Sequence, residues 1–179
     1  MNKKHSDRTL RIVIASMFAA MIAVTTAFVQ LKTPTGGYVH LGDSMIYLAA
    51  SFLPLPYAVA AAAIGGGIAD LLVYPETILY TIIIKALNAV FFSAKGDKLL
   101  TKRNALMTIL SGLVTIVGYS VSKLIRQLLA GDSLPSAVTN ALWKAPENTI
   151  QAVASALIYI VIAVALDKAQ IKKRMLRDL

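Results

Sequence analysis

Residues 44–69 read SMIYLAASFLPLPYAVAAAAIGGGIA, and no charged residue interrupts them. This stretch is longer than the ~20 residues that cross the hydrocarbon core of a bilayer as a helix. Pro54 and Pro56 lie near its middle, where they remove two backbone donors and restrict the residues before them. The stretch therefore forms either one long helix or two helices broken at residues 54–56, and the topology of the chain depends on which.

The basic residues decide between these alternatives. Most of the 18 lysines and arginines lie in three clusters that border apolar segments, namely Lys3, Lys4, Arg8 and Arg11; Lys95, Lys98, Lys102 and Arg103; and Lys168, Lys172, Lys173, Arg174 and Arg177. Such clusters mark the cytoplasmic ends of membrane spans. If all three share one side, the chain between the first two must cross an even number of times, which favours two helices in residues 44–69.

The sequence thus predicts an all-α integral membrane protein with six membrane-spanning helices and both termini in the cytoplasm. A single domain over residues 1–179 is expected, with helices at about 12–31, 43–54, 56–74, 77–94, 105–128 and 146–167 and a basic cytoplasmic tail at 168–179. The second helix is short, roughly 18 Å at 1.5 Å per residue. We expect the polar loop 32–42 to enter the outer half of the bundle there and to cover an outward-facing pocket.

The composition supports a membrane protein and excludes several other classes. Hydrophobic residues make up 57% of the chain and charged residues 15%, with a mean hydropathy of +0.68, which is too little charge for the surface of a soluble domain. The net charge of +9 is confined to the clusters, so nucleic-acid binding is not expected. The apolar run 12–31 is longer than a signal-peptide core and is interpreted as a retained helix.

Small residues form two smooth helix faces. Ala15, Ala19, Ala23 and Ala27 recur every four residues, and Gly65 and Gly66 belong to a second such face. Helices associate closely over small residues in lipid, so these faces either pack inside the bundle or bind another membrane protein. The glycines lack the lysine and hydroxyl pattern of a phosphate-binding loop, so any ATP-driven work must come from a partner.

Polar residues inside apolar spans mark function by default, because they are costly in lipid. Three of the expected helices carry a polar face, and Asp43 and Asp70 lie near the outer half of the bundle as well. The three faces consist of Thr81, Lys85 and Asn88; of Thr115, Tyr119, Ser122, Lys123 and Arg126; and of Asn148, Gln151, Ser155 and Tyr159. Together they predict a cup edged by Tyr38, Tyr74, Tyr80 and Trp143. Its chemistry suits a small, polar, aromatic solute.

Several of these residues could have a structural role instead of a role in binding a solute. Lys85 could pair with Asp70 as a structural ion pair, and Asp43 could cap the second helix. The tyrosines and Trp143 could belong to an interfacial belt, and the basic residues Lys123, Arg126 and Lys144 could contact lipid headgroups. His40 is either a pocket residue or an ordinary loop residue. No enzymatic motif, cofactor or metal site is indicated, because neither histidine has a ligand partner at a recognisable spacing.

Short motifs along nearly the whole chain resemble those of a known family. They are GYVHLGD at 37–43, PLP at 54–56, IAD at 68–70, KAL at 85–87 and PENTIQ at 146–151. They are similar to motifs of the S components, the substrate-binding subunits of energy-coupling factor (ECF) transporters. The branch that they resemble most is associated with hydroxymethylpyrimidine or pyridoxine-like vitamins.

This resemblance implies a six-helix vitamin-binding protein in a prokaryotic plasma membrane. Its partners would be a transmembrane coupling (T) component, docked on Ala15 and Ala19, and two cytoplasmic ATPases. The substrate site maps onto His40, Lys85, Asn88, Tyr119, Asn148 and Gln151, to which the polar faces add Asp43 and Asp70. The rival hypotheses are a self-sufficient solute channel or facilitator, which predicts flux without an ATPase, and a non-transport membrane scaffold.

Overall fold

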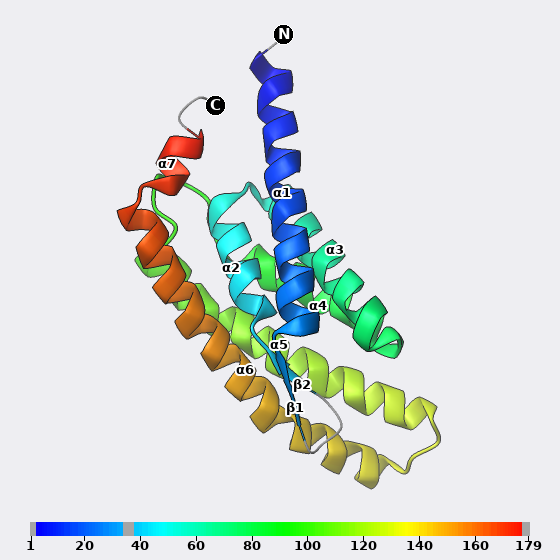
Figure 1. The fold of residues 1–179 in the computed structure, drawn as a ribbon. Helices are drawn as coiled ribbons and strands as arrows, with labels where there is room; N and C mark the ends of the chain where they lie inside the picture. The colour runs from blue at the N-terminus through cyan, green and yellow to red at the C-terminus, as the bar shows by residue number, and fades with distance from the viewer. Residues whose placement is uncertain (1–2, 34–37, 177–179) are drawn as a thin grey trace.

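A computed structural model describes residues 3–33 and 38–176, with side chains described for residues 7–33 and 38–175. The elements in chain order are α1 (Lys3–Phe28), β1 (Gln30–Lys32), β2 (Tyr38–His40), α2 (Gly42–Phe52), α3 (Leu55–Val73), the 3-10 turn η1 (Pro75–Thr77), α4 (Ile78–Val90), α5 (Lys102–Leu129), α6 (Leu134–Lys168) and α7 (Ile171–Leu176). Figure 1 shows them as a helical bundle with one small hairpin.

The chain is a helical membrane protein. Four of the described helices, α1, α3, α5 and α6, are long and apolar enough to cross a bilayer. Their exposed surfaces carry large aliphatic side chains such as Ile64, Leu113 and Leu157, as expected where a helix faces lipid tails. The helices α2 and α4 have 11 and 13 residues, which is short for a full crossing.

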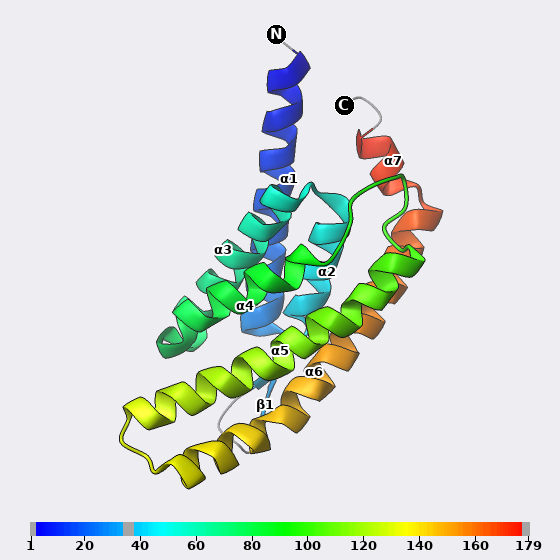
Figure 2. The same ribbon diagram turned by 180° about the vertical axis from the view of Figure 1, so that it is seen from behind.

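The stretch 44–69 forms two helices. Leu53 is extended and Pro54 has a ψ of 146°, so the backbone turns before α3 begins. Every residue of α2 is buried, because α2 lies among the longer helices (Figures 1 and 2). The sequence left this choice open on local grounds, and the structure takes the broken form.

Other element boundaries differ from the expected ones. The helix expected at 146–167 is the second part of α6, which starts at Leu134 and continues through Pro146. The loop 32–42 contributes to an antiparallel hairpin that pairs Leu31 with Val39. The expected tail 168–179 contains the short helix α7. Proline removes one helical donor, yet α6 continues through Pro146.

The two ends of the bundle differ in charge. Figure 1 shows both termini at one end, with the hairpin and the α5–α6 turn toward the other. The segment between α4 and α5 lies beside the end of α6, because the amides of Leu99 and Leu100 donate to the Asp167 carboxylate at 2.7 and 2.9 Å. The three basic segments of the chain therefore gather at the end that holds the termini (Figure 2).

The small-residue faces serve mainly to bring helices of this chain together. A Cβ on Gly65 would lie 2.6 Å from the backbone oxygen of Ala19, and a Cβ on Gly66 would lie 2.7 Å from the Lys85 side chain. Gly65, Gly66 and Ala23 are buried. Gly65 and Gly66 therefore pack against α1 and α4 of this chain, and the partner interface expected at Ala15, Ala19, Ala23, Gly65 and Gly66 remains a prediction.

A groove remains open between α1 and α3. Its lining includes Ala15, Ala19, Ala60 and Ala61, with Ile64 and Ile68 along α3. The alanines have short side chains, so another helix could approach the backbone closely here. Of the five residues expected to contact a partner, Ala15 and Ala19 line this groove.

Candidate functional site

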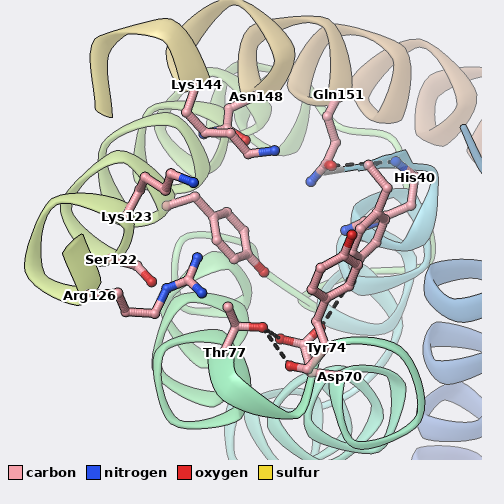
Figure 3. Close-up of a pocket in the computed structure, with 12 residues that line it drawn as sticks. His40, Asp70, Tyr74, Thr77, Ser122, Lys123, Arg126, Lys144, Asn148 and Gln151 are labelled. Carbon is pink, nitrogen blue, oxygen red and sulfur yellow. Dashed lines mark hydrogen bonds between the residues drawn. The ribbon is translucent and has the colours of Figure 1, made fainter. Parts of the chain in front are cut away.

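A polar pocket lies between the hairpin, the α3–α4 turn, α5 and α6. Its cavity has a volume of about 80 Å³ and is partly open to the outside. It is lined by Tyr38, His40, Asp70, Tyr74, Thr77, Tyr119, Ser122, Lys123, Arg126, Lys144, Asn148 and Gln151. Figure 3 shows these side chains converging from different elements on a shared space.

Aromatic rings form one wall of the pocket. The Tyr38 and Tyr74 rings stack with centroids 5.1 Å apart and an interplanar angle of 21°, and the His40 ring lies 5.5 Å from Tyr38. Tyr38 and His40 come from β2, whereas Tyr74 follows α3. The hairpin thus places flat surfaces against the bundle, which suits the face of a planar ligand.

Asp70 holds this wall in position. Its Oδ1 accepts a hydrogen bond from the Tyr38 hydroxyl at 3.0 Å, and its Oδ2 accepts from the hydroxyls of Thr77 and Thr81, both at 2.5 Å. The Asp70 residue is 2% exposed. These three hydrogen bonds join the hairpin to η1 and α4 through Asp70 on α3.

A second polar network lies beneath the pocket. Lys85 Nζ lies 2.5 Å from Asp43 Oδ1, and the Gln151 amide donates to Asp43 Oδ2 at 3.0 Å. Thr115 links this carboxylate at 3.4 Å to Asn88, whose amide donates to the Thr115 hydroxyl at 2.8 Å. Lys85 therefore pairs with Asp43, and the alternative of a Lys85–Asp70 pair is wrong.

The alternative role of Asp43 as a helix cap is also wrong. The residue that precedes α2 is Leu41, and no side chain caps this helix end. The carboxylate of Asp43 points instead to Lys85, Thr115 and Gln151. An unpaired carboxylate would be costly at this depth, and Lys85 supplies the opposite charge.

His40 lies between the two networks and is 3% exposed. Its Nδ1 accepts a hydrogen bond from the Gly42 amide at 3.0 Å, which leaves the ring proton on Nε2. Burial, with a further effect of the nearby Lys85 ammonium, lowers the pKa of His40 from 6.5 to about 3. The imidazole is therefore neutral near pH 7 and lines the pocket as an uncharged group.

The wall opposite the hairpin carries cations. Lys123 and Arg126 come from α5 and Lys144 from α6, and Figure 3 shows Lys123 and Arg126 across the pocket from Tyr74 and His40. Lys144 bonds Glu147 at 2.6 Å, whereas Arg126 lies 3.8 Å from Glu76. These three residues had been open to interpretation as headgroup contacts, and they lie in the pocket wall.

The pocket combines expected and unexpected residues. Of the eight expected site residues, His40, Asp70, Tyr119, Asn148 and Gln151 line it, while Asp43, Lys85 and Asn88 form the network beneath. Trp143 is 68% exposed and, like Tyr80, is outside the lining.

Two residues that line the pocket, Lys144 and Thr77, were not assigned to it from the sequence. Lys144, Asn148 and Gln151 have the i, i+4, i+7 spacing of one helix face, but Pro146 had been placed at the start of a helix. Thr77 lies seven residues after Asp70 and belongs to η1. Its contact with Asp70 depends on the turn that reverses the chain between α3 and α4.

Comparison with known proteins relates this chain to a protein family and to a curated protein. The family model described as "ECF-type riboflavin transporter, S component" matches residues 6–168. A protein of Pyrococcus woesei, described as "Uncharacterized protein in gap 3'region", is 34% identical over 101 residues, which cover 55% of this chain and 68% of the relative. The family match includes every residue that lines the pocket.

Proposed function

Because this chain belongs to the family of ECF-type riboflavin transporter S components, we propose that it is the high-affinity substrate-binding subunit of an ATP-driven vitamin uptake transporter. Proteins of this family are transport subunits rather than enzymes, and the chain is a membrane protein with several spanning helices. Its own task is then to capture a solute, and the energy for transport comes from partners.

The observation that carries this proposal is the position of the pocket. Aromatic, amide and charged side chains converge on one cavity, and the basic segments gather at the opposite end of the bundle (Figures 1 and 2). Basic segments favour the cytoplasmic side. The pocket then faces the exterior, both termini are cytoplasmic, and six helices cross or enter the membrane of a prokaryotic cell.

The substrate is a small ring compound related to the B vitamins. Hydroxymethylpyrimidine and pyridoxine are the candidates from sequence resemblance, and riboflavin is the candidate from the name of the matching family. The tyrosine wall supports a flat ring, and the amides of Asn148 and Gln151 support polar ring substituents. All three compounds belong in the test.

The partners are a transmembrane T component and two cytoplasmic ATPases. The groove lined by Ala15, Ala19, Ala60 and Ala61 is the proposed docking surface for the T component, because it admits close helix approach. Preferential docking of the empty or loaded state would drive uptake and release. A channel or facilitator would need no such partners.

Titration of the purified protein with the three candidates and thiamin tests substrate capture. We expect binding in the micromolar range or tighter for at least one compound, and mass spectrometry should detect the same compound after mild purification. Asn148→Leu should weaken binding at least tenfold. Asn140→Leu, the same change on α6 outside the pocket lining, is the control and should leave binding unchanged.

Transport assays separate this function from a facilitator. Liposomes that contain only this chain should show no flux of the bound compound, and uptake should require the T component and ATP hydrolysis. Flux through this chain alone, or no micromolar binding of any of these ring compounds or of their anionic counterparts, would overturn the proposal.

A further inference from the structure

Several buried donors in the pocket have no partner within the protein. Among the described residues, Arg126 Nε, Asn148 Nδ2 and Ser122 Oγ are inaccessible atoms without a hydrogen bond. Asn148 and Ser122 are 4% and 2% exposed. A buried donor without an acceptor costs about 1–3 kcal/mol, so a ligand that supplies acceptor atoms at this place would remove that cost.

The charges on the same side are only partly compensated. Lys144 has a close carboxylate in Glu147, but the Arg126–Glu76 contact is long, at 3.8 Å, and the Glu76 side chain is 54% exposed. Among the described residues, Lys123 forms no salt bridge. Lys123, which has no salt bridge among the described residues, and Arg126, which has only a long one, therefore face the pocket beside the unpartnered donors.

The carboxylate that lines the pocket does not neutralise this side. Asp70 accepts three hydroxyl hydrogen bonds, and Figure 3 places it near Tyr74, away from Lys123. Its donors hold it against the hairpin, so it serves the aromatic wall. The pocket is thus divided into a flat, hydroxyl-fastened wall and a wall of donors and positive charge.

We propose that the solute is a planar ring that carries an anionic oxygen group, a carboxylate or a phosphate. The ring lies against the Tyr38–Tyr74 stack, and the anionic group lies between Arg126, Lys123 and the Asn148 amide. Arginine and an amide together supply several donors to one oxyanion. This inference rests on the proposed function and defines the charge of its substrate.

A phospholipid headgroup presents the same phosphate chemistry. The stacked tyrosines favour a ring compound instead, because a phospholipid headgroup with its acyl chains offers no flat surface to that wall. The test therefore includes anionic lipid as a competitor.

The test uses compounds that share a ring and differ in the anionic group. The pairs are riboflavin and riboflavin 5′-phosphate, pyridoxine and pyridoxine 5′-phosphate, and nicotinamide and nicotinate. Calorimetric titration of the detergent-purified full chain should show at least one pair in which the anionic member binds tenfold or more tightly. That preference should decrease as salt is raised, since charge attraction is screened.

Variants assign the preference to the α5 side chains. Arg126→Gln and Lys123→Gln should each reduce the affinity for the anionic compound about tenfold and change that for its neutral partner less than threefold. Arg126→Lys should retain part of the preference. The control Arg103→Gln removes a cation at the other end of the bundle and should have no effect, and melting temperatures confirm that each variant is folded.

The outcomes separate this inference from the proposed function. Equal or tighter binding of the neutral members, or an unchanged preference in both glutamine variants, would overturn the anionic substrate and leave vitamin capture standing. Absence of binding by every member would overturn vitamin capture itself. Displacement of the solutes by phosphatidylglycerol but not by phosphatidylcholine would assign the cationic wall to lipid and overturn the inference.

Discussion

Lys85 Nζ lies 2.5 Å from Asp43 Oδ1, and neither side chain has any exposed surface. The pair joins α4 to α2, and Gln151 adds α6 through the second carboxylate oxygen. Burial of two charges is costly unless their geometry is good and further hydrogen bonds satisfy the remaining atoms. Both conditions are met here, so this pair fixes three helices beneath the pocket.

Removal of one partner from this pair should be strongly destabilising. Lys85→Met leaves the Asp43 carboxylate buried without its cation, and the expected loss is about 3–5 kcal/mol of unfolding free energy. The double variant Lys85→Met/Asp43→Leu should recover part of that loss. Thermal unfolding in detergent measures both. A double variant less stable than the single one would contradict this account.

The hydrogen bond between Tyr38 and Asp70 should control how long a ligand stays bound. Tyr38→Phe keeps the ring that stacks on Tyr74 but loses a bond to a carboxylate, worth about 1.5–3 kcal/mol. Stopped-flow measurement of the dissociation rate should show an increase of about tenfold, and the melting temperature should fall by several degrees. Tyr80→Phe, outside the pocket lining, is the control. An unchanged dissociation rate would show that the hairpin does not hold the ligand.

His40 should make the protein less stable in mild acid. Its pKa is about 3 in the folded protein against 6.5 for the free side chain, so the unfolded chain binds more protons between these values. Stability is then full above pH 6.5 and is lost as the pH falls, by about 2 kcal/mol at pH 5. His40→Asn should lose less stability between pH 7 and pH 5 than the original chain. Equal losses, measured by melting, would contradict the assignment.

Lys172 should matter for stability, whereas its neighbour Lys173 should not. Lys172 is 2% exposed, and its ammonium donates to the carbonyl oxygens of Ser51 and Ala94 at 2.9 and 2.7 Å. Lys172→Met leaves these two carbonyls without their donor and should cost about 1–3 kcal/mol. Lys173→Met changes an exposed residue and provides the matched control. Equal melting temperatures for the two variants would count against a role for Lys172 in joining α7 to the bundle.

Only part of the site could be predicted from the sequence. Asn148 and Gln151 were expected because polar groups in apolar helices need partners, and His40 was expected from the family resemblance alone. The pairing of Lys85 could not be predicted, since both Asp43 and Asp70 were available and their distances depend on how α2 and α3 pack. Arg126 and Lys123 had been identified as polar, but a pocket wall and a lipid-facing interface require the same residue types.

Composition, hydrophobic segments and the three basic clusters by themselves determined a helical membrane protein, because the bilayer demands long apolar helices and a consistent charge orientation. Only the tertiary structure decided which residues meet. Side-chain contacts between α2, α4, α5 and α6 depend on helix rotation and depth, and a bulky neighbour or a glycine such as Gly65 changes both. The pairing of Asp43 with Lys85, the burial of Lys172 and the division of the pocket into aromatic and cationic walls are therefore properties of the folded chain.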